Sequence, residues 1–279
     1  MFPKAPLALR HGPLTVYLKS LNGCVDCASF TARLAPDTPV VWLDSARQHP
    51  VTGRWSLVGF DPWLTFIAHG DRLELRTSAA TRVWRGQPLE ALRGVLARYR
   101  ASAASAAHLR AVGLVGWLSY DLNRWIERLP PPQPTERACP EMVWCGMRRS
   151  ILVDHLQRRT WLVSVADPHA PSAWASRQAR EALEQLDARV TSSRKSAQAS
   201  HSGVIDAPIA LEATSTRTEF EQMVSQALEY IRAGEVFRPM WRSVLPRHGG
   251  ARHGRSITRC GRSTRRRFRV LPPGRTSAS

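Results

Sequence analysis

Three groups of residues carry side chains whose types and spacing could do chemistry. Cys24 and Cys27 have the Cys-x-x-Cys spacing of half a zinc site. A tetrahedral zinc site needs two further ligands, and the sequence holds no second Cys-x-x-Cys and no His-x-x-x-His. We therefore predict no metal site, and we expect the five cysteines to be reduced thiols.

The other two groups are candidates for acid–base chemistry. Asp154 and His155 are adjacent, but neighbouring residues on a strand point to opposite faces, so we predict a turn there rather than a catalytic dyad. The stretch Tyr120–Glu127 combines a Tyr, an Asp, an Arg and a Glu. Within it, Arg124 and Glu127 have helical spacing, which predicts an ion pair rather than catalysis. We assign no catalytic residue.

The positive charge of the chain is concentrated near its C-terminus. The formal net charge is +18, and residues 238–279 hold 12 Arg with no Lys, Asp or Glu. The preceding 237 residues carry 28 basic against 22 acidic side chains, which is ordinary for a folded enzyme. Clustered Arg around Phe268 could neutralise phosphates and stack on bases. A nucleic-acid-binding protein is therefore an alternative function, although the uneven distribution makes nucleic acid an unexpected partner.

Hydrophobic periodicity indicates the elements that would position these residues. Alternating or short apolar runs predict strands at 38–45, 54–77 (a hairpin turning at Gly70), the first part of 108–130, and 142–167 (two strands). Helical periodicity predicts helices at 88–100, at 172–190 and from Thr216, where Glu219 completes a capping box. The mixture predicts an α+β fold in which antiparallel sheets pack against helices.

Four segments, in chain order, are similar to the N-terminal half of a known family. They are WLDSARQHPVTGRWSLVGFDP (42–62), GLVGWLSYDLNRWIERLP (113–130), ILVDH (151–155) and TRTEFEQMVSQALEYIRAGEVF (216–237). Together they resemble the chorismate-utilising enzymes, anthranilate synthase component I and aminodeoxychorismate synthase component I. The fold is then expected to resemble the N-terminal domain of anthranilate synthase component I. The resemblance fits the family members of tryptophan biosynthesis and those of folate biosynthesis equally well.

The resemblance implies a division of the chain into four parts. Residues 1–190 would form the component I-like N-terminal domain, and the Ser/Ala-rich residues 191–212 a linker. Residues 213–237 would be the first helix of a truncated chorismate-binding domain. Residues 238–279 would be an Arg-rich tail, out of frame and disordered.

The resemblance also implies an activity and partners. The family aminates chorismate with glutamine-derived ammonia, using magnesium and a glutamine amidotransferase subunit. Its catalytic carboxylates lie in the C-terminal domain, and this sequence has no acidic residue after Glu235. Since magnesium needs oxygen ligands, we expect no cofactor in this chain and no activity from it alone.

A small-molecule site is implied as well. In several family members the N-terminal half holds tryptophan, and Leu43, Ser45, Arg54, Trp55 and Ser56 match the two strands that line this site. Hydroxyl and backbone groups can bind an amino acid's charged ends, while apolar neighbours hold the indole. The alternative is that Ser45 caps a strand and Trp55 belongs to the core. A standalone regulatory module that binds an amino acid is therefore also open.

The composition changes abruptly after Phe237, from a mixture of acidic and basic residues to an Arg-rich segment, and the genetic code offers an explanation. The family continues with a Gln-x-Asn motif, for which CAG GCC AAT GTG is one coding sequence. Loss of one A gives CGG CCA ATG TG, and the chain reads Arg238-Pro239-Met240-Trp241. We expect a frameshifted, truncated family member. The N-terminal sequence lacks an apolar run that could form a signal peptide or membrane span, which predicts a cytoplasmic protein without membrane partners.

Overall fold

The structure is a computed structural model that describes residues 6–35, 37–45, 49, 52–100, 110–129, 139–196, 215–237 and 267–270. The chain divides into two compact units. Helix α4 (Arg217–Arg232) lies in one of them, and the other described elements lie in the larger unit.

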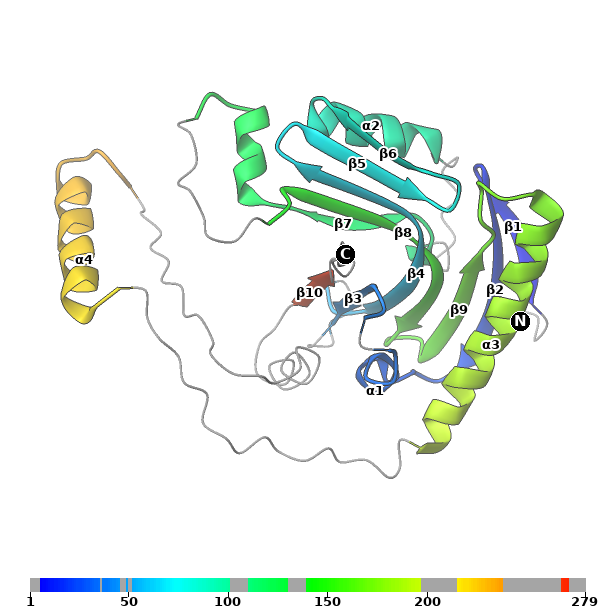
Figure 1. Cartoon of the computed structure of the whole chain (residues 1–279). Helices are drawn as coiled ribbons and strands as arrows, with labels where there is room; N and C mark the ends of the chain where they lie inside the picture. The colour runs from blue at the N-terminus through cyan, green and yellow to red at the C-terminus, as the bar shows by residue number, and fades with distance from the viewer. Residues whose placement is uncertain are drawn as a thin grey trace, which may run out of the picture. The chain divides into compact units, whose positions relative to one another are not determined.

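A curled antiparallel sheet forms the larger unit (Figure 1). The main strand order is β1-β2-β9-β8-β4-β3-β10; in addition β5 pairs with β4 and β6, and β7 pairs with β8. The strand bounds are β1 (Leu7–His11), β2 (Leu14–Asn22), β3 (Val40–Asp44), β4 (Trp55–His69), β5 (Arg72–Thr77), β6 (Thr81–Arg85), β7 (Leu114–Leu118), β8 (Met142–Asp154), β9 (Arg159–Val165) and β10 (Arg267–Val270).

The curl is set by an irregularity in the longest strand. β4 and β8 are 15 and 13 residues long, and the register of their pairing shifts between Pro62 and Leu64. Proline has no N–H to give to the ladder, so inside a sheet it belongs at such a bulge. Asp61 before it has a left-handed φ of 58°, which Asp tolerates better than most residues. The first half of β4 therefore pairs with β3, and the second half with β5.

Helices cover the sheet on two sides. Helix α3 (Ser172–Ser196) lies along β9 and β2 and buries a stripe of small and branched residues that includes Ala175, Leu183 and Val190 (Figure 1). The short helix α1 (Cys27–Thr31) joins the same core cluster through Phe30. Helix α2 (Pro88–Arg98) buries Leu92 and Val95 in a second cluster.

The elements expected from local signals are confirmed. The β4–β5 hairpin turns at Gly70, whose φ is 57°, and the β8–β9 turn includes Arg158 with φ 49°. Helix α2 begins at Pro88, and the α+β architecture with antiparallel strands is present. Helix α3 runs to Ser196 and so extends into the segment expected to be a linker. The rest of that linker, up to residue 212, lies outside the described residues.

The Arg-rich tail departs from its expected disorder at four residues. Arg267–Val270 forms β10, which pairs antiparallel with β3 from Val41 to Asp44. An edge strand offers unpaired N–H and C=O groups to any extended segment, and β10 uses those of β3. The other residues of 238–279 lie outside the described part of the chain.

Helix α4 has the expected N-terminal capping box. The Glu219 N–H donates to Thr216 Oγ1 at 3.3 Å, and the Thr216 N–H donates to Glu219 Oε2 at 2.7 Å. Gly234 follows the C-terminus with a φ of 77°. Most of its large apolar side chains are exposed, Phe220 and Leu228 among them, whereas Ala227 is buried.

Candidate functional site

The ends of three neighbouring strands converge at one edge of the sheet. Asp44 ends β3 and Ser45 follows it, Arg54 directly precedes β4, and Asp154 ends β8. Because β4 is antiparallel to both neighbours, its beginning lies beside both of their ends, with Trp55 opposite Asp154. The structure thus brings together the two sequence segments from which the site was predicted.

Ser56 is the centre of a hydrogen-bond network at this edge. Its hydroxyl donates to Asp44 Oδ1 at 2.9 Å and accepts from the Ser45 N–H at 3.2 Å. His155 Nε2 lies 2.7 Å from the same oxygen. A hydroxyl has one proton, and Asp44 receives it, so His155 must be the donor and carry its proton on Nε2. Ser56 is fully buried and its hydroxyl is fully bonded, so it positions the groups around it.

The Ser45 hydroxyl oxygen can still accept a hydrogen bond from a ligand. Its Oγ donates a short hydrogen bond to the backbone carbonyl of Trp55 and is half-buried. The proton is used in this bond, but the oxygen's lone pairs can still accept from an ammonium group. The bond also ties the end of β3 to the beginning of β4.

Arg54 is held by a buried carboxylate. Its Nε donates to both oxygens of Asp154 at 3.0 Å, and Nη2 donates to Oδ2 at 2.6 Å. Asp154 Oδ1 also accepts the N–H groups of Leu156 and Gln157, at 3.0 and 3.1 Å. Burial alone would raise the pKa of Asp154, but the Arg54 and backbone hydrogen bonds outweigh it and lower the pKa.

The adjacent Asp154 and His155 have separate partners. Asp154 binds Arg54 and caps the turn after β8, whereas His155 binds Ser56. This confirms the predicted turn and shows that the two side chains do not form a dyad.

Trp55 and Leu43 supply apolar surface. The Cζ atoms of Arg54 and Arg110 lie 4.7 and 5.4 Å from the Trp55 ring centroid, and Trp161 packs at 6.0 Å. Leu43 is half-buried and contacts two core clusters. Trp55 is half-buried and packs against the core cluster, as the alternative interpretation expected of a structural residue.

Sequence reasoning left Asp44, Asp154 and His155 out of the site. Asp44 was adjacent to a predicted residue, and that adjacency was a usable signal. His155 lies 99 residues from Ser56, and only the pairing of β8 with β4 brings them together.

The Tyr120–Glu127 group does not form the expected ion pair. Arg124 Nη2 donates to Glu141 Oε1 at 2.8 Å, and the Trp125 indole N–H donates to Glu141 Oε2 at 3.4 Å. The 3₁₀ helix Tyr120–Trp125 ends before Glu127, so Arg124 and Glu127 do not share one helix face, and Glu141 takes the guanidinium instead. Tyr120 is 87% exposed and takes no part in a cluster of acid–base groups.

Within the described residues, no group of three or more His, Cys, Asp or Glu side chains is placed to hold a metal ion. Cys24 is exposed, whereas Cys27 is buried and its burial raises the thiol pKa to about 12.

None of the described helices is long and apolar enough to cross a membrane.

Residues 38–239 match the sequence model of a family described as chorismate binding enzyme. The chain belongs to this family. The chorismate-binding family match covers the segments that carried the sequence resemblance, which is thereby confirmed.

Two names recur among the curated relatives of this chain. It is 28% identical over 214 residues to anthranilate synthase component 1 of Cereibacter sphaeroides, a match that covers 72% of this chain and 41% of that protein. It is 29% identical over 126 residues to aminodeoxychorismate synthase component 1 of Klebsiella aerogenes, covering 45% and 28%. The chain thus spans less than half the length of these relatives.

A solved structure is similar too. Anthranilate synthase component I from Streptococcus pneumoniae matches with a TM-score of 0.49 and 16% identity, over 67% of this chain and 40% of that one.

Proposed function

We propose that this chain is the N-terminal, amino-acid-binding part of component I of a chorismate-utilising synthase. Support comes from the family match over 38–239 and from relatives named anthranilate or aminodeoxychorismate synthase component 1. The name component 1 implies a second component, for which we propose a glutamine amidotransferase subunit. The complete enzyme would then aminate chorismate with ammonia from glutamine.

The 279-residue chain by itself is proposed to lack this activity. Its sequence has no acidic residue after Glu235, and the described residues hold no cluster that fits magnesium. Chorismate carries two carboxylates, and a metal between it and the protein needs oxygen ligands from both. We therefore expect purified chain with ammonia to leave chorismate unchanged, as measured by its absorbance. Formation of an aminated product would overturn this part of the proposal.

The site at the strand ends is proposed to bind tryptophan. Asp44 Oδ1 accepts from Ser56, so Oδ2 would be the oxygen that accepts from the ammonium group of the ligand. The ammonium group would then lie between Asp44 and the lone pairs of Ser45 Oγ. The carboxylate of the ligand would face Arg54. Asp154 accepts from Nε and Nη2 of this guanidinium group, and Nη1, which lies in the same plane, would donate to the ligand. Leu43 would contact the indole. The observation that carries the proposal is the set of hydrogen bonds that joins Asp44 and Ser45 at the end of β3 to Trp55 and Ser56, the residues that follow Arg54.

Titration calorimetry with L-tryptophan tests this site. We expect Ser45→Ala and Asp44→Asn to weaken binding by about tenfold or more, since each removes a charge-assisted hydrogen bond. Ser192→Ala is the matched control, because Ser192 also donates to a backbone carbonyl, at 2.9 Å, but lies on α3. Tryptamine and indole-3-propionate should each bind more weakly than tryptophan. Equal affinity of Ser45→Ala and the wild type would contradict the assignment.

A further inference from the structure

The outer edge of β3 is completed by a segment that lies far away in the sequence. One edge of β3 pairs with β4, from Val40 to Leu43, and β10 pairs with the other edge (Figure 1). The family match covers residues 38–239, so β3 lies inside it and β10 (Arg267–Val270) lies outside it. An edge strand presents unpaired N–H and C=O groups that another extended backbone can bind. The family part of the chain therefore has an open edge, which residues from beyond the matched region fill.

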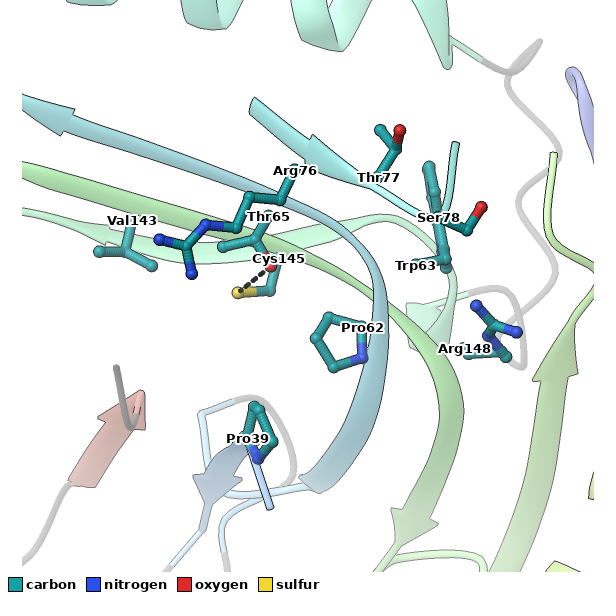
Figure 2. A pocket seen from close by; sticks show the side chains of 10 residues that line it. All are labelled: Pro39, Pro62, Trp63, Thr65, Arg76, Thr77, Ser78, Val143, Cys145 and Arg148. Atoms are coloured by element: carbon teal, nitrogen blue, oxygen red, sulfur yellow. Dashed lines mark hydrogen bonds between the residues drawn. The ribbon is translucent and has the colours of Figure 1, made fainter. Parts of the chain in front are cut away.

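The inner side of β3 is loosely packed where the strand begins. Pro39, directly before the strand, and Pro62, in the bulge of β4, both line a cavity of about 270 Å³ (Figure 2). Side chains around a void lose the packing contacts that a filled interior would supply. Four residue pairs join β3 to β4. Pairing along the outer edge is therefore a substantial part of what holds β3 in the sheet.

The apolar positions of β10 are in register with those of β3. Phe268 is opposite Leu43, and Val270 is opposite Val41. Residues directly opposite each other in an antiparallel pair share one face of the sheet. Val41 is fully buried on this face, in a cluster that Leu43 packs against. A slip by one residue in either direction would place an arginine opposite Leu43, so the sequence pattern favours the observed register.

The charges of the two segments are complementary. Residues 37–45, which contain β3, hold Asp37 and Asp44 and no basic residue. β10 contains two arginines, and no residue from 238 to 279 is acidic. In the register, Arg267 is opposite Asp44. Opposite charges at paired positions of a sheet are favourable and like charges are not, so this edge selects a basic segment over an acidic one.

We infer that the outer edge of β3 is a strand-addition site for an extended peptide in which basic and apolar residues alternate, and that Arg267–Val270 is its intramolecular occupant. In this mode of recognition the main-chain hydrogen bonds supply affinity, and the alternating residues supply specificity. A ladder of four residue pairs is short, so the occupant leaves and returns by local opening of the sheet edge. A separate peptide of the same sequence binds the edge when β10 is absent from it. Because it rests on strand pairing, this assignment depends neither on the proposed activity nor on tryptophan binding.

Hydrogen exchange of the full chain, followed by mass spectrometry, tests the occupant. Phe268→Pro/Arg269→Pro removes the N–H donors of two consecutive residues, and one of the two must face β3, because alternate residues donate across an antiparallel pair. Amide exchange in fragments that contain β3 should accelerate by about tenfold or more, since a protecting strand is lost. Arg255→Pro/Ser256→Pro is the matched control, because it places the same two prolines in the same Arg-rich tail but outside β10. Exchange in the β4–β8 ladder should stay slow in both variants, which shows that the sheet remains folded.

An added peptide tests the site itself. A synthetic peptide with the sequence of residues 265–272 should restore slow exchange of β3 in the Phe268→Pro/Arg269→Pro variant. The same peptide with glutamate in place of Arg267 and Arg269 should need about tenfold more to do so, because it brings like charges to the edge. In the wild-type chain, protection of β3 should not depend on protein concentration, because the occupant belongs to the same molecule.

Three results would overturn the assignment. The first is equal exchange of β3 in the proline variant and its control. The second is failure of the added peptide to restore protection, or equal potency of the arginine and glutamate peptides. The third is protection of β3 in the wild type that rises with protein concentration, which would assign the occupant to a second copy of the chain.

Discussion

The carboxylate of Asp154 accepts three hydrogen bonds from Arg54, 100 residues earlier in the sequence, and this contact joins the end of β8 to the beginning of β4. The Asp154 side chain is fully buried, while that of Arg54 is 26% exposed. The pair fixes the guanidinium that we propose as a carboxylate ligand. It also caps the turn that leads into β9.

Replacing Asp154 by Asn is expected to destabilise the fold. The Asn oxygen can still cap the turn, but Arg54 loses its counter-charge. Breaking a buried pair costs roughly 3–5 kcal/mol, and the partial exposure of Arg54 reduces this to about 2 kcal/mol. Urea unfolding measures it. Asp71→Asn, which removes the exposed pair with Arg85, should cost less than about 0.5 kcal/mol; equal losses in both variants would contradict the ranking.

The Ser56 network predicts a second stability difference. Ser56→Ala leaves the Ser45 N–H, Asp44 and His155 without their shared partner, which costs about 1–3 kcal/mol in a buried setting. Ser192→Ala on the surface of α3 should change the free energy of unfolding by no more than about 0.5 kcal/mol. Chemical denaturation of both variants decides this, and a Ser56→Ala protein as stable as the control would refute the network.

His169 should make stability depend on pH. Its Nε2 lies 2.8 Å from the Tyr99 hydroxyl, and burial lowers the pKa of His169 below its ordinary 6.5. The unfolded chain therefore takes up the proton first, so stability is full above pH 6.5 and falls as the pH drops from 6.5 toward the folded pKa. His169→Gln should flatten this slope in thermal melts, and His69→Gln at the exposed hairpin should not. A slope that survives His169→Gln would assign the effect to another group.

Two glycines predict opposite effects of the same substitution. A Cβ at Gly116 would lie 2.1 Å from the Val143 carbonyl oxygen, so Gly116→Ala must displace backbone between β7 and β8. A Cβ at Gly94 would meet nothing within 4 Å, and Ala there should stabilise α2 by about 0.5–1 kcal/mol. Melting temperatures should move down for Gly116→Ala and up for Gly94→Ala. A shift in the same direction for both would show that the described packing is wrong at one of them.

Local sequence signals predicted the helices and the hairpin, whereas the pairing of strands far apart in the sequence determines which residues meet in the candidate site. Pro88, Gly70 and the Thr216–Glu219 box act within one turn of chain, so the sequence alone indicated α2, the β4–β5 hairpin and α4. The contacts of Ser56 with His155 and of Arg124 with Glu141 depend on which strands are neighbours, and no residue spacing encodes that. The expected Arg124–Glu127 pair was wrong for this reason. Predicted site residues came close to the network because a family resemblance, rather than periodicity, pointed to both strands.

The most direct test of the central claim is a crystal structure of the chain with L-tryptophan. The account predicts the ammonium group within hydrogen-bond distance of Asp44 and Ser45, the carboxylate at Arg54 and the indole against Leu43. Tryptophan bound elsewhere, or no bound tryptophan at saturating concentration, would contradict it.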